Sequence, residues 1–473
     1  MTPARAALSA IDPRLAELVA PLRRLAVPAS ILVLALAAAY NMRYGSAQLR
    51  SADFPSFYQA GLALRAGHDP YLPAMAFVHA YTPGGNGTYF AARAYVYAPF
   101  FALLMVPLTL LPTYPALTVW DLLNVAFLVL AVCAALRAAG LGPGPGLVLV
   151  LSAAGAVTLP MHREWALGQS DVLVLALVCT ALWARAARRP GGAGVLLGAA
   201  CAIKPELLLL ALLLLWKRDF HLALSTLAST AVLALAPFLL LGRAAWSHFW
   251  TVWSFWSDQY LPFVHNESPK GVLARLFTVN PVAHPLAVLP SIETIVWVAV
   301  VVIVTVLVVA VVSTQPLRRD SLSLLEIGLV TEAIMLVSPL TERPYFMLLL
   351  IPLLGLVAWI SQARPGDTLV HRAAVTGVVI WVLMLGPVEV AETVLGAGIS
   401  TGSAAAPIYV LLAPLYLWLG VAAFVLQLIV VARVRGLGVL PAAAGTVRRA
   451  PALVASWLRD AGIALALTRR RAA

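Results

Sequence analysis

Long uninterrupted apolar runs dominate this sequence and limit what it can fold into. Many windows hold more than about 17 apolar residues, enough for a helix to cross the roughly 30 Å of hydrocarbon in a bilayer. Hydrophobic residues make up 62% of the chain and charged residues only 11%, whereas soluble domains are about one quarter charged. A transmembrane barrel would show alternating segments of about ten residues instead. The sequence therefore predicts an all-α, polytopic membrane protein.

Basic residues stand at the ends of the apolar runs and set the predicted orientation. Arg23 and Arg24 precede the first run, Ala26 to Met42, and by the positive-inside rule they place the N-terminus in the cytoplasm. The net charge of +12 follows this distribution and does not indicate nucleic-acid binding. The predicted domains are a cytoplasmic lead (1–25), a transmembrane domain (26–432) and a basic cytoplasmic tail (433–473) with an amphipathic helix from Arg448 to Arg471.

Two long loops are expected on the outer side of the membrane, at residues 43–94 and 243–293. Within the first, Pro55 to Ala66 has the apolar spacing of a helix that lies along the membrane surface. The second is rich in tryptophan between residues 246 and 260, which is typical of a helix at the membrane interface. We therefore expect an interfacial helix in each loop.

Two apolar segments do not fit a simple alternation of crossings. Residues 95–111 contain two prolines and are predicted to form a partial or re-entrant segment, which is tolerated where protein or a water-filled cavity covers it. Residues 191–216 have basic residues at both ends and must cross an even number of times. We predict a helical hairpin whose tip, Lys204-Pro205, reaches towards the outer leaflet.

The predicted topology gathers polar side chains at the outer face, beginning with Asp53. One acid near several cations beside lipid suits a reaction on a lipid-linked anion such as a polyprenyl-phosphate sugar. A carboxylate can take the proton of an acceptor hydroxyl, and positive charge stabilises the phosphate as it leaves. The sequence therefore suggests an enzyme that acts at the membrane border.

Seven short motifs occur in a fixed order along the chain: Asp53 to Gly61, Gly67 with Pro70 and Tyr71, Tyr97 with Pro99, Gly168-Gln169, Leu197-Gly198 with Ile203 to Pro205, Asn266 and Ser268 with Arg275, and Ser338-Pro339. In their order and spacing they resemble glycosyltransferase family 87, a GT-C group of polyprenyl-phosphate-mannose-dependent α-mannosyltransferases. The resemblance covers about residues 26–360. It implies a GT-C-type bundle of about 11–13 hydrophobic helices, an outward-facing cleft, a lipid-phosphate donor and inversion at the anomeric carbon.

The resemblance implies that Asp53 is the general base, and the residues at the outer face suggest the remaining roles. No metal and no cofactor are expected, since the lipid-linked sugar is itself the substrate. Many relatives carry a Trp and a His pair after the Ser-Pro motif, where this chain has Leu340 to Arg343, so Arg343 is a candidate to replace a histidine. The predicted donor-phosphate ligands are Lys204, Arg163, His265 and Arg343, and the predicted substrate-binding residues are Tyr58, Gln169, Asn266 and Glu342.

The expected partners are a polyprenyl-phosphate sugar, a glycolipid or glycan acceptor and membrane lipid, with the site on the extracytoplasmic side of the plasma membrane. Asp53 has a structural alternative as the N-cap of the following helix. Lys204 has one as a lysine that extends to the interface, and Gln169 as a helix–helix hydrogen bond. Alternative functions are a lipid or sugar transporter or flippase, a membrane scaffold, and arabinofuranosyl or glucosyl transfer.

Overall fold

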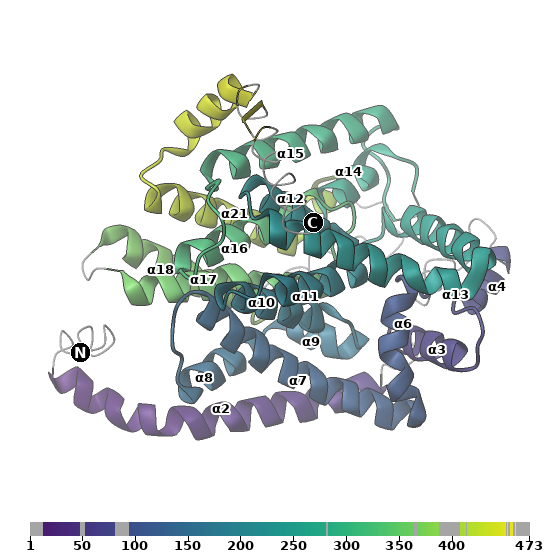
Figure 1. Ribbon diagram of the computed structural model, residues 1–473, viewed down its shortest axis with the longest axis horizontal. Coiled ribbons are helices and arrows are strands. Elements are labelled where there is room, and N and C mark those ends of the chain that lie inside the picture. Colours follow the sequence, from purple (N-terminus) through teal and green to yellow (C-terminus); the bar gives the residue numbers. More distant parts are fainter. Residues whose placement is uncertain are drawn as a thin grey trace, which may run out of the picture.

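The structure of the protein, a computed structural model, consists of helices and their connections throughout the part of the chain that it describes (Figure 1). No β-strand occurs among these residues, and several helices are long and apolar enough to cross a membrane. The predicted all-α, polytopic membrane fold is therefore confirmed. The described residues are 13–47, 53–80, 94–280, 282–363, 367–386, 407–412, 414–450, 452, 455, 456 and 459.

Five helices of the described chain have the length and composition of membrane spans, or six if a pair bent by 72° counts as one. About 11–13 hydrophobic helices were expected. Some of the hydrophobic helices in the described chain are too short to cross a membrane alone, since a crossing takes about 20 residues. The spans are α7 (Thr113–Ala138), α13 (Phe220–Tyr260), α15 (Pro290–Val311), η3 with α17 (Arg343–Leu349, Leu350–Gln362) and α21 (Leu415–Val434), and the bent pair is α8 (Pro145–Ala156) with α9 (Leu159–Leu167). Shorter helices include α10 (Asp171–Ala186), α14 (Pro269–Phe277), α16 (Ser321–Val337), α18 (Thr368–Leu383) and α20 (Pro407–Leu412).

The first helix, α2 (Pro13–Ala47), is longer than the predicted first span. It continues through residue 25, where the sequence suggested a boundary between lead and span. Helix α3 (Phe54–Arg65) matches the predicted surface helix to within one residue at each end, and α4 (Leu72–Ala80) follows it. Residues 81–93 of the predicted outer loop, and most of the predicted C-terminal amphipathic helix, lie outside the described residues.

The proline-containing segment 95–111 forms two short helices, α6 (Pro99–Met105) and η1 (Val106–Leu110). They comprise 7 and 5 residues, and a 12-residue α-helix is only about 18 Å long. Both pack against α3. Their length supports the predicted partial segment, because a full crossing needs roughly 30 Å.

The predicted hairpin consists of α11 (Pro190–Ile203), η2 (Pro205–Leu207) and α12 (Leu208–Trp216), with Lys204 in extended conformation between the arms. Helix α11 also packs along α13. A Cβ built on Gly198 would lie 2.6 Å from Ser229 Cβ, and one on Gly194 would collide with Ser225 four residues earlier. The two helices therefore run in the same direction. Helices α11 and α13 both begin just after turns that contain basic residues. Because the two helices are parallel and begin at the same side, the segment between them must return to that side, which supports a hairpin with Lys204 at its tip.

Replacement of Gly198 by alanine should destabilise the protein, because the added methyl group would meet the backbone of Thr226 at 3.0 Å as well as Ser229. Overpacking of this kind costs about 1–3 kcal/mol. Thermal unfolding in detergent measures the effect. Gly191→Ala is the control, since in the same helix its Cβ would meet no atom of the described chain within 4 Å. Equal melting temperatures for both variants would contradict the prediction.

Candidate active site

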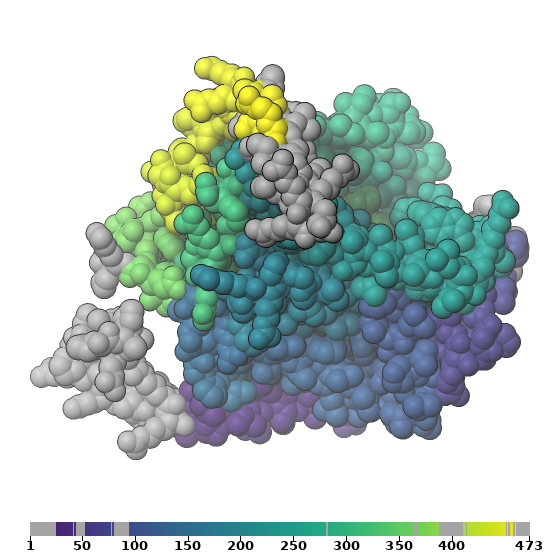
Figure 2. All heavy atoms as spheres, viewed as in Figure 1, coloured from purple at the N-terminus to yellow at the C-terminus, as the bar shows by residue number. Residues whose placement is uncertain are grey.

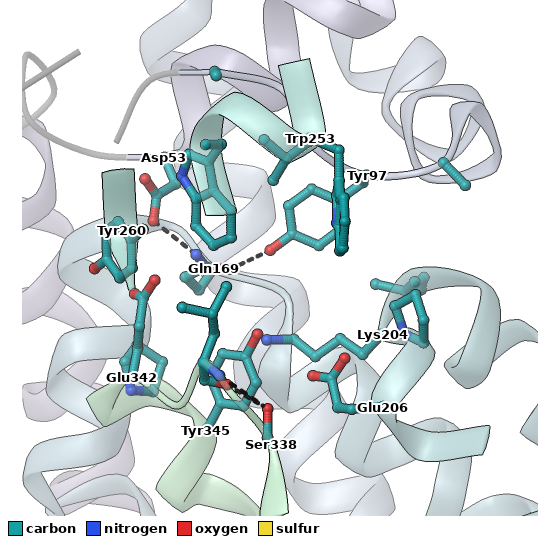
Figure 3. A pocket seen from close by; sticks show the side chains of 18 of the residues that line it. Asp53, Tyr97, Gln169, Lys204, Glu206, Trp253, Tyr260, Ser338, Glu342 and Tyr345 are labelled. Carbon is teal, nitrogen blue, oxygen red and sulfur yellow. Dashed lines mark hydrogen bonds between the residues drawn. The ribbon is translucent and has the colours of Figure 1, made fainter. Parts of the chain in front are cut away.

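A cavity of about 1050 Å³ is enclosed by segments that are far apart in the sequence. Its walls come from the start of α3, the turns between α9 and α10 and between α11 and η2, the second half of α13, and the segment before η3. The structure brings seven of the nine predicted site residues to this cavity, and Figure 3 shows part of its lining. The seven are Asp53, Arg163, Gln169, Lys204, His265, Glu342 and Arg343.

Asp53 stands directly before α3, at the position of its N-cap. Its side chain makes no capping hydrogen bond with the described chain, so the capping alternative is wrong. The carboxylate instead accepts a hydrogen bond from Gln169 Nε2, with 2.7 Å between Nε2 and Oδ2. The backbone N–H of Asp53 donates to Leu167 O at 2.8 Å. Two bonds to the α9–α10 connection therefore hold Asp53 at the cavity.

Gly168 allows the connection between α9 and α10 to lie close to the start of α3. It ends α9 in the left-handed conformation, with φ of 66°, which costs a residue with a Cβ about 1–2 kcal/mol. A Cβ there would also lie only 2.5 Å from Phe54 Cβ. The Trp120 indole N–H donates to Gly168 O at 3.1 Å. The Gly168-Gln169 motif thus has a local reason: the glycine permits the turn that presents the glutamine to Asp53.

The cavity raises the proton affinity of two carboxyl groups in loops outside the spanning helices. Burial raises the pKa of Asp53 well above its usual value, and the negative charge of Glu342 raises it further, against the effects of Gln169 and Lys204. Burial also raises the pKa of Glu342 to about 7, against Lys204 and the Tyr260 hydroxyl. A raised pKa makes a carboxylate a stronger base once it is ionised. Asp53 is therefore suited to accept a proton.

Lys204 already has partners in the structure. Its Nζ lies 2.8 Å from Asp171 Oδ1 and 3.3 Å from the centroid of the Tyr345 ring, and both members of the ion pair are buried. Asp171 begins α10, where a negative charge is favourable. The alternative in which Lys204 extends to the interface is therefore wrong. A bound phosphate would share the ammonium with Asp171, a residue to which sequence reasoning assigned no role.

The other three predicted phosphate ligands differ in their surroundings. Arg343 Nε lies 2.8 Å from Oε1 of the buried Glu267. The surrounding protein and the charge of Arg343 lower the pKa of His265 to about 4, although much of its side chain is exposed. The imidazole lines the cavity and can offer an N–H group there. Arg163 lines the cavity on α9.

Two predicted substrate-binding residues, Tyr58 and Asn266, are absent from the described lining of the cavity. The Tyr58 hydroxyl donates to Leu111 O at 2.7 Å. Asn266 is fully buried and donates to Leu261 O and Pro339 O, at 2.9 and 3.0 Å. Its Oδ1 accepts from the N–H groups of Ser268 and Thr341. Both side chains join segments of the fold, and their role in substrate binding stays a prediction.

Three tryptophans, Trp246, Trp250 and Trp253, form an aromatic wall of the cavity, and Figure 3 labels Trp253 together with Asp53 and Tyr97. The adjacent ring centroids are 5.6 Å apart in both pairs, and each residue is both exposed and part of the lining. This part of α13 follows a kink at Gly242, where φ is 86°. Figure 2 shows this end of the helix, in teal, over the purple and blue segments that include α4 and α6. Exposed tryptophans therefore form part of the cavity wall.

Tyrosine hydroxyls are the site groups that sequence reasoning missed. Tyr97, Tyr260 and Tyr345 line the cavity with Asp53 and Lys204 (Figure 3). Tyr97 stood in a recognised motif next to Pro99 without a role, and Tyr260 was grouped with the interfacial aromatic residues. The described residues contain no group of three or more His, Cys, Asp or Glu side chains that could hold a metal ion.

Comparison with known proteins identifies the family. The family model described as "Glycosyltransferase family 87" matches residues 95–339, just over half of the chain. The chain belongs to glycosyltransferase family 87. This confirms the predicted family and makes the protein a membrane glycosyltransferase. The match includes Arg163, Gln169, Lys204 and His265, and it excludes Asp53.

One relative of this family 87 protein is a Mycobacterium tuberculosis (strain ATCC 25618 / H37Rv) enzyme named "Polyprenol-phosphate-mannose-dependent alpha-(1-2)-phosphatidylinositol mannoside mannosyltransferase". The two are 33% identical over 131 residues, which cover 27% of this chain and 30% of the relative. The match thus spans less than a third of the relative. No solved structure matches the chain.

Proposed function

We propose that this family 87 protein transfers a sugar, mannose in the first instance, from a polyprenyl-phosphate donor to a glycolipid or glycan acceptor. The site is proposed to face the extracytoplasmic side of the plasma membrane, with both termini in the cytoplasm. The observation that carries the proposal is a half-buried, hydrogen-bonded carboxylate, Asp53, in a cavity that is also lined by exposed tryptophans. A lipid-linked sugar has the matching polarity, since its sugar is polar and its tail is apolar.

The proposed reaction is a single displacement. The acceptor hydroxyl attacks the anomeric carbon while Asp53 takes its proton. The bond between that carbon and the phosphate oxygen breaks on the opposite face, and the polyprenyl phosphate leaves with the electron pair. The configuration of the anomeric carbon is inverted. The reaction needs no general acid, because phosphate is already a good leaving group.

The proposed phosphate ligands are Lys204, Arg163, Arg343 and His265. Positive charge and N–H groups aimed at the leaving oxygen stabilise the transition state. Lys204 and Arg343 each lie beside a carboxylate, Asp171 and Glu267. These acids neutralise the cations while the site is empty and keep them in a fixed position. The proposal therefore assigns the carboxylates an orienting role in addition to a structural one.

The test is transfer by the purified protein in lipid vesicles. Radiolabelled mannose is supplied as polyprenyl-phosphate mannose or, in a parallel reaction, as GDP-mannose, with phosphatidylinositol mannoside and a total membrane lipid extract as acceptors. We expect label to reach the glycolipid fraction from the polyprenyl donor alone. Polyprenyl-phosphate arabinofuranose and glucose test the alternative sugars. Transfer from GDP-mannose, or vesicle flux of intact donor without transfer, would overturn the proposal.

A further inference from the structure

Gln169 has a fixed place between Tyr97 and Asp53 (Figure 3). Its Nε2 donates to Asp53 Oδ2 at 2.7 Å, and its Oε1 accepts from the Tyr97 hydroxyl at 3.1 Å. The backbone N–H of Ser170 donates to the same Oε1, with 3.2 Å between the nitrogen and the oxygen. The side chain is buried, with 6% of its surface exposed. Three hydrogen bonds therefore determine where the amide group lies.

These bonds also determine which way the amide faces. A backbone N–H can only donate, so Ser170 requires the carbonyl oxygen of the Gln169 amide on its side. A rotation of the amide by 180° would place an N–H group against Ser170 and remove the acceptor that Tyr97 uses. The NH₂ group of Gln169 is therefore directed at Asp53.

As a result, only one carboxylate oxygen of Asp53 accepts a hydrogen bond from the described residues. Oδ2 accepts from Gln169, while Oδ1 accepts no hydrogen bond from any residue in the described ranges. We propose that Gln169 is a positioning residue: it fixes the Asp53 carboxylate so that Oδ1 is presented to the acceptor hydroxyl, and Tyr97 sets the orientation of the Gln169 amide. The catalytic meaning of this inference rests on the proposed function, whereas the positioning itself does not.

Donation by Gln169 has an electrostatic consequence for Asp53. A donor bonded to a carboxylate favours the ionised form, which opposes the effect of burial on this group. Loss of the donor should therefore raise the pH at which Asp53 ionises. A hydrogen bond to a charged group is worth about one pH unit or more. The other titratable groups that act on Asp53 or are acted on by it are Glu342, Lys204, Asp171, Tyr97 and Tyr260.

The test measures the protonation of Asp53 without any substrate. Dicyclohexylcarbodiimide reacts with protonated carboxyl groups in apolar surroundings, and peptide mass spectrometry gives the extent of labelling at Asp53 as a function of pH. We expect the midpoint to move upwards by about one pH unit in Gln169→Leu. It should move upwards by less in Tyr97→Phe, because Ser170 still holds the amide. Gln169→Asn, whose amide is one methylene too short, replaces the leucine variant if that one does not fold.

Tyr95→Phe is the matched control. It makes the same chemical change two residues away, and the Tyr95 hydroxyl bonds to Ala98 O and Ala102 N instead of Gln169. An unchanged midpoint in the Gln169 variant that folds, or an equal shift in Tyr95→Phe, would overturn the inference. The labelling is independent of sugar transfer, so a failure of the proposed function leaves this result unchanged. Conversely, an unchanged midpoint refutes the positioning role even where Asp53 proves essential for transfer.

Discussion

Asp53→Asn should reduce sugar transfer by about a thousandfold, within the range of about 10²–10⁴ that a general base contributes. Asparagine has the same shape but no basic oxygen. Its carbonyl oxygen can still accept the hydrogen bond that Gln169 donates at 2.7 Å in the wild type. The loss should therefore appear in the rate of transfer with little change in the fold. Initial rates with polyprenyl-phosphate mannose, measured alongside thermal unfolding, test both parts.

The stability of Asp53→Asn should equal or exceed that of the wild type above neutral pH. The pKa of Asp53 is raised by burial, so the folded protein binds this proton more tightly than the unfolded chain. Stability then falls as pH rises from the unfolded pKa through the folded one. The neutral asparagine removes that loss. A variant that melts well below the wild type at pH 8 would contradict this account.

Asp258→Asn serves as the matched control for transfer. Asp258 is an exposed carboxylate on α13, so its loss should leave the rate within about twofold of the wild type, as is usual for a surface change away from special features. If Asp53→Asn kept a tenth or more of the wild-type rate, general base catalysis would have to be assigned to another group. Glu342, which acts on Asp53 across the cavity, is the next candidate.

Hydropathy patterns and residues with strong backbone preferences predicted the parts of the fold that depend on local sequence. The surface helix was expected at Pro55 to Ala66, and α3 is Phe54–Arg65. Helix α13 has a kink at Gly242, next to the start of the outer loop expected at residue 243. These features depend on periodicity and backbone preference, which a single segment contains. The length of α2 was missed because Pro21 and Pro28, on either side of residue 25, favour a break there, yet the helix continues through both.

The partners of polar side chains were much harder to predict, because they depend on segments far apart in the chain. Asn266 resembled a substrate ligand in its motif, yet it bonds to Pro339 O across 73 residues. Lys204 was predicted to bind phosphate, but nothing in the sequence indicated that Asp171 lies beside it, or that Lys217 is paired with Glu326 in the same way. Sequence reasoning thus located the polar cavity but could not divide its residues into ligands and supports.

The Lys204–Asp171 pair allows the two roles of Lys204 to be separated. Lys204→Met leaves a buried carboxylate without its cation, and removal of one partner from such a pair costs about 3–5 kcal/mol. Asp171→Asn leaves the ammonium beside Tyr345 with a similar loss. The double variant has no uncompensated charge from the pair and should recover most of the stability, since neutral replacements of buried pairs are often tolerated. Unfolding in detergent measures all three.

Transfer by the double variant then decides the function of Lys204. If the ammonium holds the donor phosphate, the stable double variant should still lose at least a hundredfold in rate, as when a group that stabilises developing charge is removed. If Lys204 only compensates Asp171, the rate should recover together with stability. The buried pair of Lys217 and Glu326 provides the control, because neither residue is part of the described cavity lining. Its neutral double variant, Lys217→Met with Glu326→Gln, should regain both stability and transfer, which shows that the loss at Lys204 belongs to its place in the cavity.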